Sequence, residues 1–160
     1  MTARITSRRQ FLLLACGALA STRAAAQLPP NIQAMRKTAL EEAVRKVVGG
    51  APLRRGKVKL DLPPLVENGN SVPLTVRVES PMTSADHVRA IHVFTEKNPQ
   101  PNVISAWLGP RAGRAVLTTR TRIADTGTVT AIAQMSDGSF WLESIQVVVT
   151  LSACLEDGLI

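Results

Sequence analysis

The chain has 160 residues, enough for one folded domain, and its 45% hydrophobic and 19% charged residues are typical of a chain with a packed core rather than a disordered one. Four of its nineteen Lys and Arg lie in residues 1–26, which contain no acidic residue. Residues 27–160, with fifteen basic and twelve acidic residues, therefore account for less than half of the formal net charge of +7. With no dense basic run, no Tyr and three Phe and two Trp, the composition argues against nucleic-acid binding.

Residues 1–26 have the layout of an export signal. Arg8-Arg9 precedes an apolar run over residues 11–20, which is followed by the small residues Ala24-Ala25-Ala26. The apolar run is about half the roughly 20 residues of a membrane-spanning helix, so we expect no stable membrane insertion. Paired arginines at this position are typical of the twin-arginine route, which exports folded proteins. The sequence therefore predicts a periplasmic protein cleaved after Ala26.

A second cleavage site competes with the first. Leu13-Leu14-Ala15-Cys16 resembles a lipoprotein processing box, and cleavage there would leave a lipidated Cys16, although only a short apolar run would then follow the arginines. Cleavage after Ala26 leaves Cys154 as the one cysteine of the mature chain, and one cysteine cannot form an internal disulfide. A lone cysteine is usually a buried inert thiol, but chain termini are usually exposed. The position of Cys154 near the C-terminus therefore favours an accessible thiol with a function over a buried inert one.

Residues 27–55 are predicted to form a linker and an amphipathic helix. Gln27–Pro30 is the linker and Asn31 is a plausible N-cap. Gly49-Gly50 ends the helix. We expect the apolar face to pack on the chain's own domain, with a membrane-surface helix as the alternative. The apolar positions recur at helical period: Ile32, Met35, Ala39, Leu40, Ala43, Val44, Val47 and Val48.

Residues 56–151 change to a period of two, which predicts β-strands. Ser136-Asp137-Gly138 is typical of a hairpin, and a turn is expected at Glu67-Asn68-Gly69-Asn70. The predicted fold class is all-β: an immunoglobulin-like antiparallel β-sandwich preceded by one N-terminal helix. Residues 152–160 form a C-terminal tail, with Cys154 expected near solvent. The expected strands cover residues 58–62, 72–78, 88–95, 103–108, 116–123, 128–135 and 139–151.

Few residues could support catalysis without a partner. His87 and His92 are the only imidazoles, and they lack an HExxH context or a second cysteine that would complete a zinc site. No nucleophile elbow, phosphate loop or dinucleotide fingerprint is present, so we expect no metal, no cofactor and no independent enzyme. An unperturbed thiol is mostly protonated at neutral pH, and Glu156 and Asp157 oppose its ionisation. Cys154 is therefore predicted to carry a group that a partner enzyme attaches.

Several segments, taken in order, resemble the SoxY family of sulfur carriers of thiosulfate oxidation. The resemblance covers residues 55–154 well and the helical region loosely, and a cysteine at the end of the last strand agrees with it. It implies an immunoglobulin-like periplasmic protein that pairs with a second small β-protein, SoxZ. The segments that carry it are Gly56–Pro63, Val66–Leu74, Glu96–Pro101, Thr119–Ile123 and Met135–Ser139.

The resemblance also implies a role for the C-terminal cysteine, which corresponds to Cys154. In the family this cysteine holds the sulfur substrate covalently on a swinging arm while Sox-type enzymes act on it. Family members end in Gly-Gly-Cys-Gly-Gly, whereas this chain has Ser152-Ala153 before the cysteine and Leu155-Glu156 after it. Since glycines give an arm its backbone freedom, a non-catalytic binding or scaffolding module is the alternative function.

Overall fold

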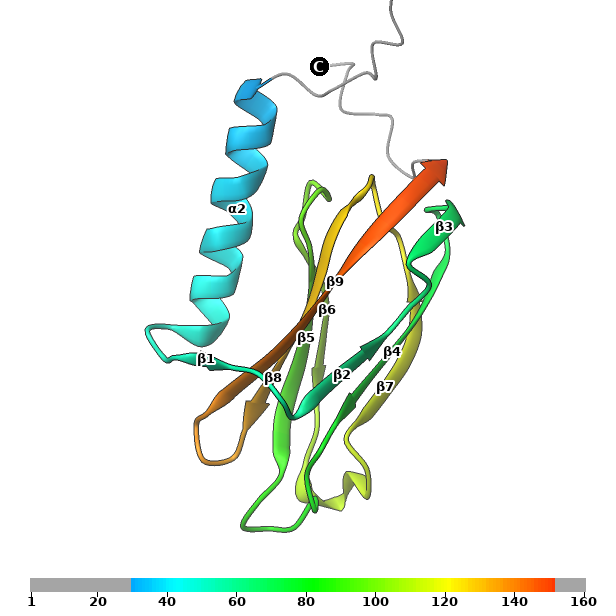
Figure 1. Ribbon diagram of the computed structural model, residues 1–160. Helices are drawn as coiled ribbons and strands as arrows, with labels where there is room; N and C mark the ends of the chain where they lie inside the picture. Colours follow the sequence, from blue (N-terminus) through cyan, green and yellow to red (C-terminus); the bar gives the residue numbers. More distant parts are fainter. Residues whose placement is uncertain (1–29, 152–160) are drawn as a thin grey trace, which may run out of the picture.

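The computed structural model describes residues 30–151, which form a two-layer β-sandwich with one helix against the larger sheet (Figure 1). The larger sheet has the strand order β1-β9-β8-β5-β6, with β3 also paired to β9, and the smaller sheet has the order β2-β4-β7. The elements are α2 (Pro30–Val48), β1 (Leu53–Arg54), β2 (Val58–Asp61), β3 (Leu65–Asn68), β4 (Val72–Val78), β5 (Val88–Thr95), β6 (Asn102–Trp107), the short 3₁₀ helix η1 (Pro110–Ala112), β7 (Val116–Thr121), β8 (Gly127–Met135) and β9 (Phe140–Leu151).

Helix α2 begins at Pro30, a residue suited to the first turn, and ends at Val48, followed by Gly49, whose positive φ of 64° terminates the helix. The second half of its apolar face packs on a separate small core under the helix, so the prediction that α2 packs on its own domain is confirmed. This core consists of Val48, Phe94, Ile132 and Phe140, with Leu40, Ala43, Val44, Val47, Ala51 and Leu142 packed against it.

The first half of α2 differs from the prediction. Met35, expected on the packed face, is 70% exposed, while Arg36 is buried. No helix residue before Leu40 belongs to the small core, because the apolar side chains of the sheet lie under the second half of the helix. The apolar stripe read from the sequence was therefore correct for the second half and wrong for Met35.

The sheets confirm the seven predicted strands, each within two residues at either end. Strands β1 and β3 were missed, and both pair in parallel with β9, so the sandwich is not wholly antiparallel. Glu67 and Asn68 belong to β3, so the turn predicted at residues 67–70 is confined to its second half. The hairpin between β8 and β9 is confirmed, with Gly138 at a φ of 82°.

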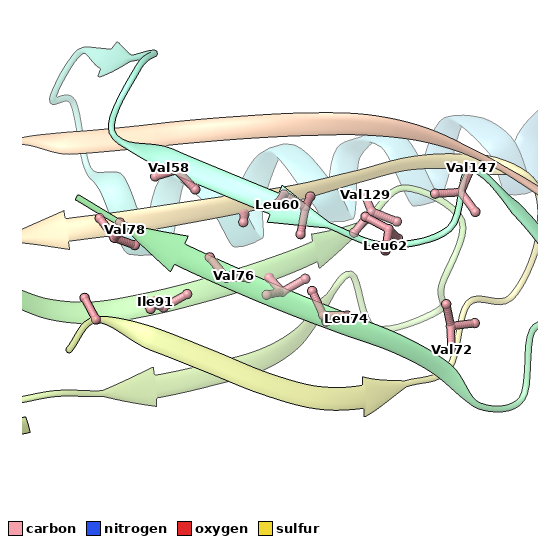
Figure 2. Close-up of a cluster of buried hydrophobic side chains, with 14 of the residues drawn as sticks. Val58, Leu60, Leu62, Val72, Leu74, Val76, Val78, Ile91, Val129 and Val147 are labelled. Carbon is pink, nitrogen blue, oxygen red and sulfur yellow. The ribbon is translucent and has the colours of Figure 1, made fainter.

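The main core lies between the two sheets. Strand β4 alternates inward and outward side chains along its length, and Val76 at its centre is fully buried. Figure 2 shows Leu74 and Val76 of β4 with Val58 and Leu60 of β2, facing the strands of the larger sheet. This core fixes the position of β9, which lies between β1 and β8 in the larger sheet and ends at Leu151 (Figure 1).

Candidate functional site

The predicted site residue, Cys154, lies outside the described residues, so its surroundings are approached from Leu151. Cys154 follows Leu151, the last residue of β9, by three positions in the sequence. The described residues that hold the end of β9 are therefore those that precede the predicted site.

On one side, the end of β9 is held by β3. Val66 pairs with Val149, and the N–H of Val148 donates to the carbonyl of Pro64 at 2.8 Å. The N–H of Gly69, just after β3, donates to the carbonyl of Leu151 at 2.9 Å. The last strand is thus fixed by backbone hydrogen bonds up to its final residue.

On the other side, one threonine takes the place of a neighbouring strand. Strand β8 begins at Gly127, which pairs with Val147, so Val149 lies beyond the ladder. The Thr126 hydroxyl accepts from the N–H of Val149 at 3.0 Å and donates to its carbonyl at 3.3 Å. Both backbone groups of Val149, a buried residue, are satisfied by this one side chain.

Gly69 connects the end of β9 to the smaller sheet. Its carbonyl accepts from the N–H of Ile123 at 2.8 Å, which brings the segment after β7 to the same end of the sandwich. Asn98 fixes this segment further, donating to the carbonyl of Arg122 at 2.9 Å and accepting from the N–H of Ala124 at 2.8 Å. The exposed Arg122 is therefore held close to the point at which β9 ends.

A cleft of 450 Å³ opens between the edges of β6 and β7. One of its lining residues, Arg120, donates from Nε to the Ser71 hydroxyl at 2.8 Å, and no ion pair with a carboxylate is found for Arg120 or Arg122 within residues 30–151. Two unneutralised guanidinium groups at this end favour anions nearby. The lining residues are Asn98, Pro99, Gln100, Asn102, Val103, Ile104, Arg120, Thr121 and Arg122.

Glu96 lies two residues before Asn98, the first residue in the sequence that lines this cleft. Burial raises its pKa, but the hydrogen bond from the Thr128 N–H, 3.0 Å from Oε2, and the Lys97 ammonium, 3.1 Å from Oε1, outweigh burial and lower the pKa of Glu96 below its ordinary value. Its charge is therefore retained at neutral pH and is paired with Lys97.

The two histidines lie in different parts of the sandwich. The backbone N–H of His87 donates to the hydroxyl of Ser136. Ser136 lies in the hairpin before β9, at the opposite end of that strand from Leu151. His92 is buried on β5, its Nδ1 lies 2.8 Å from the Ser105 hydroxyl, and burial lowers its pKa. Across residues 30–151, no group of three or more His, Cys, Asp or Glu side chains is arranged to hold a metal ion.

The residues that fix the end of β9 were not predicted from the sequence. Thr126 and Val149 are 23 positions apart in the sequence, and Gly69 and Leu151 are separated further still, so no local pattern marks either contact. The one indication in the sequence was Gly69, which belongs to the predicted turn at residues 67–70. Within the described part of the chain, no helix has the length and apolar character needed to cross a bilayer.

The family model for sulfur oxidation protein SoxY matches residues 44–154. Among solved structures, the sulfur carrier protein SoxY from Chlorobium limicola f thiosulfatophilum is 27% identical, with a TM-score of 0.60 over 71% of this chain and 98% of that chain. No curated protein matches the sequence.

A second group of solved structures shares the fold alone. The superoxide reductase (neelaredoxin) from Ignicoccus hospitalis is 18% identical, with a TM-score of 0.52 over 59% of this chain and 80% of that chain. At this identity, the similarity extends to the arrangement of the sandwich and not to its chemistry.

Proposed function

Because the chain belongs to the SoxY family of sulfur oxidation proteins, we propose that it is a sulfur carrier rather than an enzyme, and that Cys154 holds the cargo covalently. The observation that carries this proposal is the family match over residues 44–154, which extends to the cysteine itself. The relative from Chlorobium limicola, which is named a sulfur carrier protein, is matched over 98% of its length.

The cargo consists of sulfur intermediates of thiosulfate oxidation. Joining the Cys154 sulfur to the outer sulfur of thiosulfate forms one S–S bond, releases the thiol proton and removes two electrons. These electrons pass to an oxidising partner enzyme. Later attack by water on the terminal sulfonate breaks the S–S bond to it, releases sulfate and a proton, and leaves a persulfide on Cys154. The carrier contributes the thiol and its presentation, and the separate Sox-type enzymes contribute the chemistry.

The proposed setting is the periplasm. Residues 1–26 direct export by the twin-arginine route, residues 27–55 form the linker and helix, residues 56–151 form the SoxY-like sandwich, and residues 152–160 form the carrier tail. The partners are a SoxZ-like small β-protein, forming a heterodimer, and the Sox-type enzymes that receive the cargo.

The hydrogen bonds at the end of β9 support the proposal that the sulfur cargo is presented from a firmly held strand. Hydrogen bonds from Gly69 and Thr126 hold the strand at Leu151 and Val149, the last described residues before the cysteine in the sequence. The tail departs from the family pattern, because Leu155 and Glu156 stand where glycines would lie. This departure favours one alternative function, a non-catalytic binding or scaffolding module that has kept the sandwich and lost the cargo.

Intact mass of the protein isolated from the periplasm of thiosulfate-fed cells tests the proposal. We expect a chain beginning near Gln27, with reductant-labile sulfur additions that map to Cys154 and are absent from Cys154→Ser. Urea unfolding of the Ser variant should match the native chain, which separates loss of cargo from loss of fold. An unmodified thiol during thiosulfate oxidation would support the scaffolding alternative, and a lipid mass on Cys16 would overturn the cleavage site.

A further inference from the structure

The sandwich has an open side between β6, the outer strand of the larger sheet, and β7, the outer strand of the smaller sheet. The 450 Å³ cleft lies on this side, between the first residues of β6 and the last residues of β7. Val103 and Ile104, half-buried against the main core, form its apolar part. A concave site that combines apolar surface with a few polar groups is typical of small-molecule binding.

Two arginines give the cleft its charge. Arg120 and Arg122 both line it, and none of its lining residues is acidic. Within residues 30–151, neither guanidinium lies within ion-pair distance of a carboxylate. The carboxylate that precedes the cleft in the sequence, Glu96, is engaged by the Lys97 ammonium at 3.1 Å. The cleft therefore presents uncompensated positive charge, which attracts anions.

Both arginines are held from outside the cleft. The Nε of Arg120 donates to the Ser71 hydroxyl at 2.8 Å and Nη2 to the Ser71 carbonyl at 3.3 Å, which leaves its other N–H groups without a partner in the described part of the chain. Asn98, only 8% exposed, fixes the backbone around Arg122 by donating to the Arg122 carbonyl and accepting from the Ala124 N–H. The cleft is therefore formed before a ligand arrives, which lowers the cost of binding.

Uncharged donors complete the lining. The side chains of Gln100 and Thr121 line the cleft, and neither has a hydrogen-bond partner among residues 30–151. An amide N–H and a hydroxyl both donate to the oxygens of an anion. Guanidinium groups beside such donors have the chemistry of an oxyanion site, because guanidinium groups donate paired hydrogen bonds to oxygens of this kind.

The cleft lies at the end of the sandwich where β9 ends. The N–H of Ile123, the residue after Arg122, donates to the carbonyl of Gly69 at 2.8 Å. The N–H of Gly69 donates in turn to the carbonyl of Leu151 at 2.9 Å. The charged wall of the cleft and the last residue of β9 are thus joined through a single glycine.

We propose that this cleft binds a sulfur oxyanion of the S-sulfonate class, –S–SO₃⁻, through the guanidinium groups of Arg120 and Arg122. The sulfonate oxygens face the arginines, and the divalent sulfur, which is polarisable and weakly hydrated, faces Val103 and Ile104. The group comes either from a free S-sulfonate or from the sulfonate of cargo on Cys154. Only the second source rests on the proposed function, since the cleft itself does not depend on the thiol.

An NMR titration of the thiol-free chain tests the site. The probe is S-methyl thiosulfate, CH₃–S–SO₃⁻, added at constant ionic strength to the full chain carrying Cys16→Ser and Cys154→Ser. We expect saturable shifts of the backbone amides of residues 98–104 and 120–122. Methanesulfonate, which has the same charge and lacks the divalent sulfur, should bind about threefold more weakly. Equal binding of the two probes would overturn the contact with the apolar part of the cleft.

Three variants separate the site from general attraction by a basic protein. Arg120→Gln and Arg122→Gln should each raise the dissociation constant of S-methyl thiosulfate by about tenfold or more, because each removes charge-assisted hydrogen bonds. The matched control is the exposed Arg77→Gln, opposite Val116 at the other end of β7, which removes the same charge and should change the constant less than about twofold. Shifts that do not saturate, or equal weakening by Arg77→Gln and Arg122→Gln, would overturn the proposal.

Loading of the thiol distinguishes the two sources. Tetrathionate converts a cysteine thiolate to –S–S–SO₃⁻ and releases thiosulfate, so it loads Cys154 in the full chain carrying Cys16→Ser. Shifts around Arg122 in the loaded chain without added probe would support the cargo as the occupant. Shifts that appear only with added probe would support a free oxyanion and overturn the use of the cleft for cargo. A carrier role disproved by other means would leave the titration unchanged, because that chain has no thiol.

Discussion

Replacing Thr126 by valine should loosen the end of β9. The Thr126 hydroxyl satisfies both the N–H and the carbonyl of Val149, a residue only 7% exposed. Valine keeps the shape of threonine but has no hydroxyl, so a buried backbone donor would lose its partner. Leaving such a group unsatisfied costs about 1–3 kcal/mol, which is a large part of the roughly 5–15 kcal/mol that stabilises a typical domain.

Two measurements distinguish this effect from a general loss of packing. Urea unfolding should show a free energy of unfolding about 1–3 kcal/mol lower for Thr126→Val. Amide hydrogen exchange should show faster exchange over residues 145–151 than elsewhere in the larger sheet. Thr126→Ser keeps the hydroxyl and should retain most of the protection. If the valine and serine variants have the same stability and the same exchange at Val149, the hydroxyl bridge does not hold the strand.

Three further predictions concern the helix, the hairpin and a buried imidazole. Phe94→Ala, at a fully buried position under α2, should lower the free energy of unfolding by about 3–5 kcal/mol in urea titrations and should speed proteolysis of the helix. Gly138→Ala should cost about 1–2 kcal/mol in the same assay because φ is 82° with no steric neighbour, whereas Gly109→Ala, at a φ of −126°, should cost almost nothing. Burial lowers the pKa of His92 below 6.5, so the folded state resists a proton that the unfolded state accepts. The stability contributed by the neutral imidazole should therefore be retained above about pH 6.5 and lost as the pH falls below it, and urea titrations should show that His92→Gln flattens this slope.

The fold could be predicted largely from local patterns, because buried apolar and exposed polar side chains alternate from one residue to the next along a strand. Strand β4 shows this best, since its inward positions are buried and the rest are not. The strands β1 and β3 could not be found in this way. Strand β1 has only two residues, and the sequence of β3, with adjacent Leu65 and Val66 followed by two polar residues, does not alternate. Met35 was misplaced because the helix stripe continues beyond the apolar part of the sheet.

The candidate site was less accessible to sequence reasoning. Cys154 could be named from its isolation and from the family pattern, and its role stays a prediction because it lies outside the described residues. The groups that fix the strand before it could not be named, since Thr126 and Gly69 reach β9 only through the folded sandwich. Long-range hydrogen bonds of this kind leave no periodic trace in a sequence.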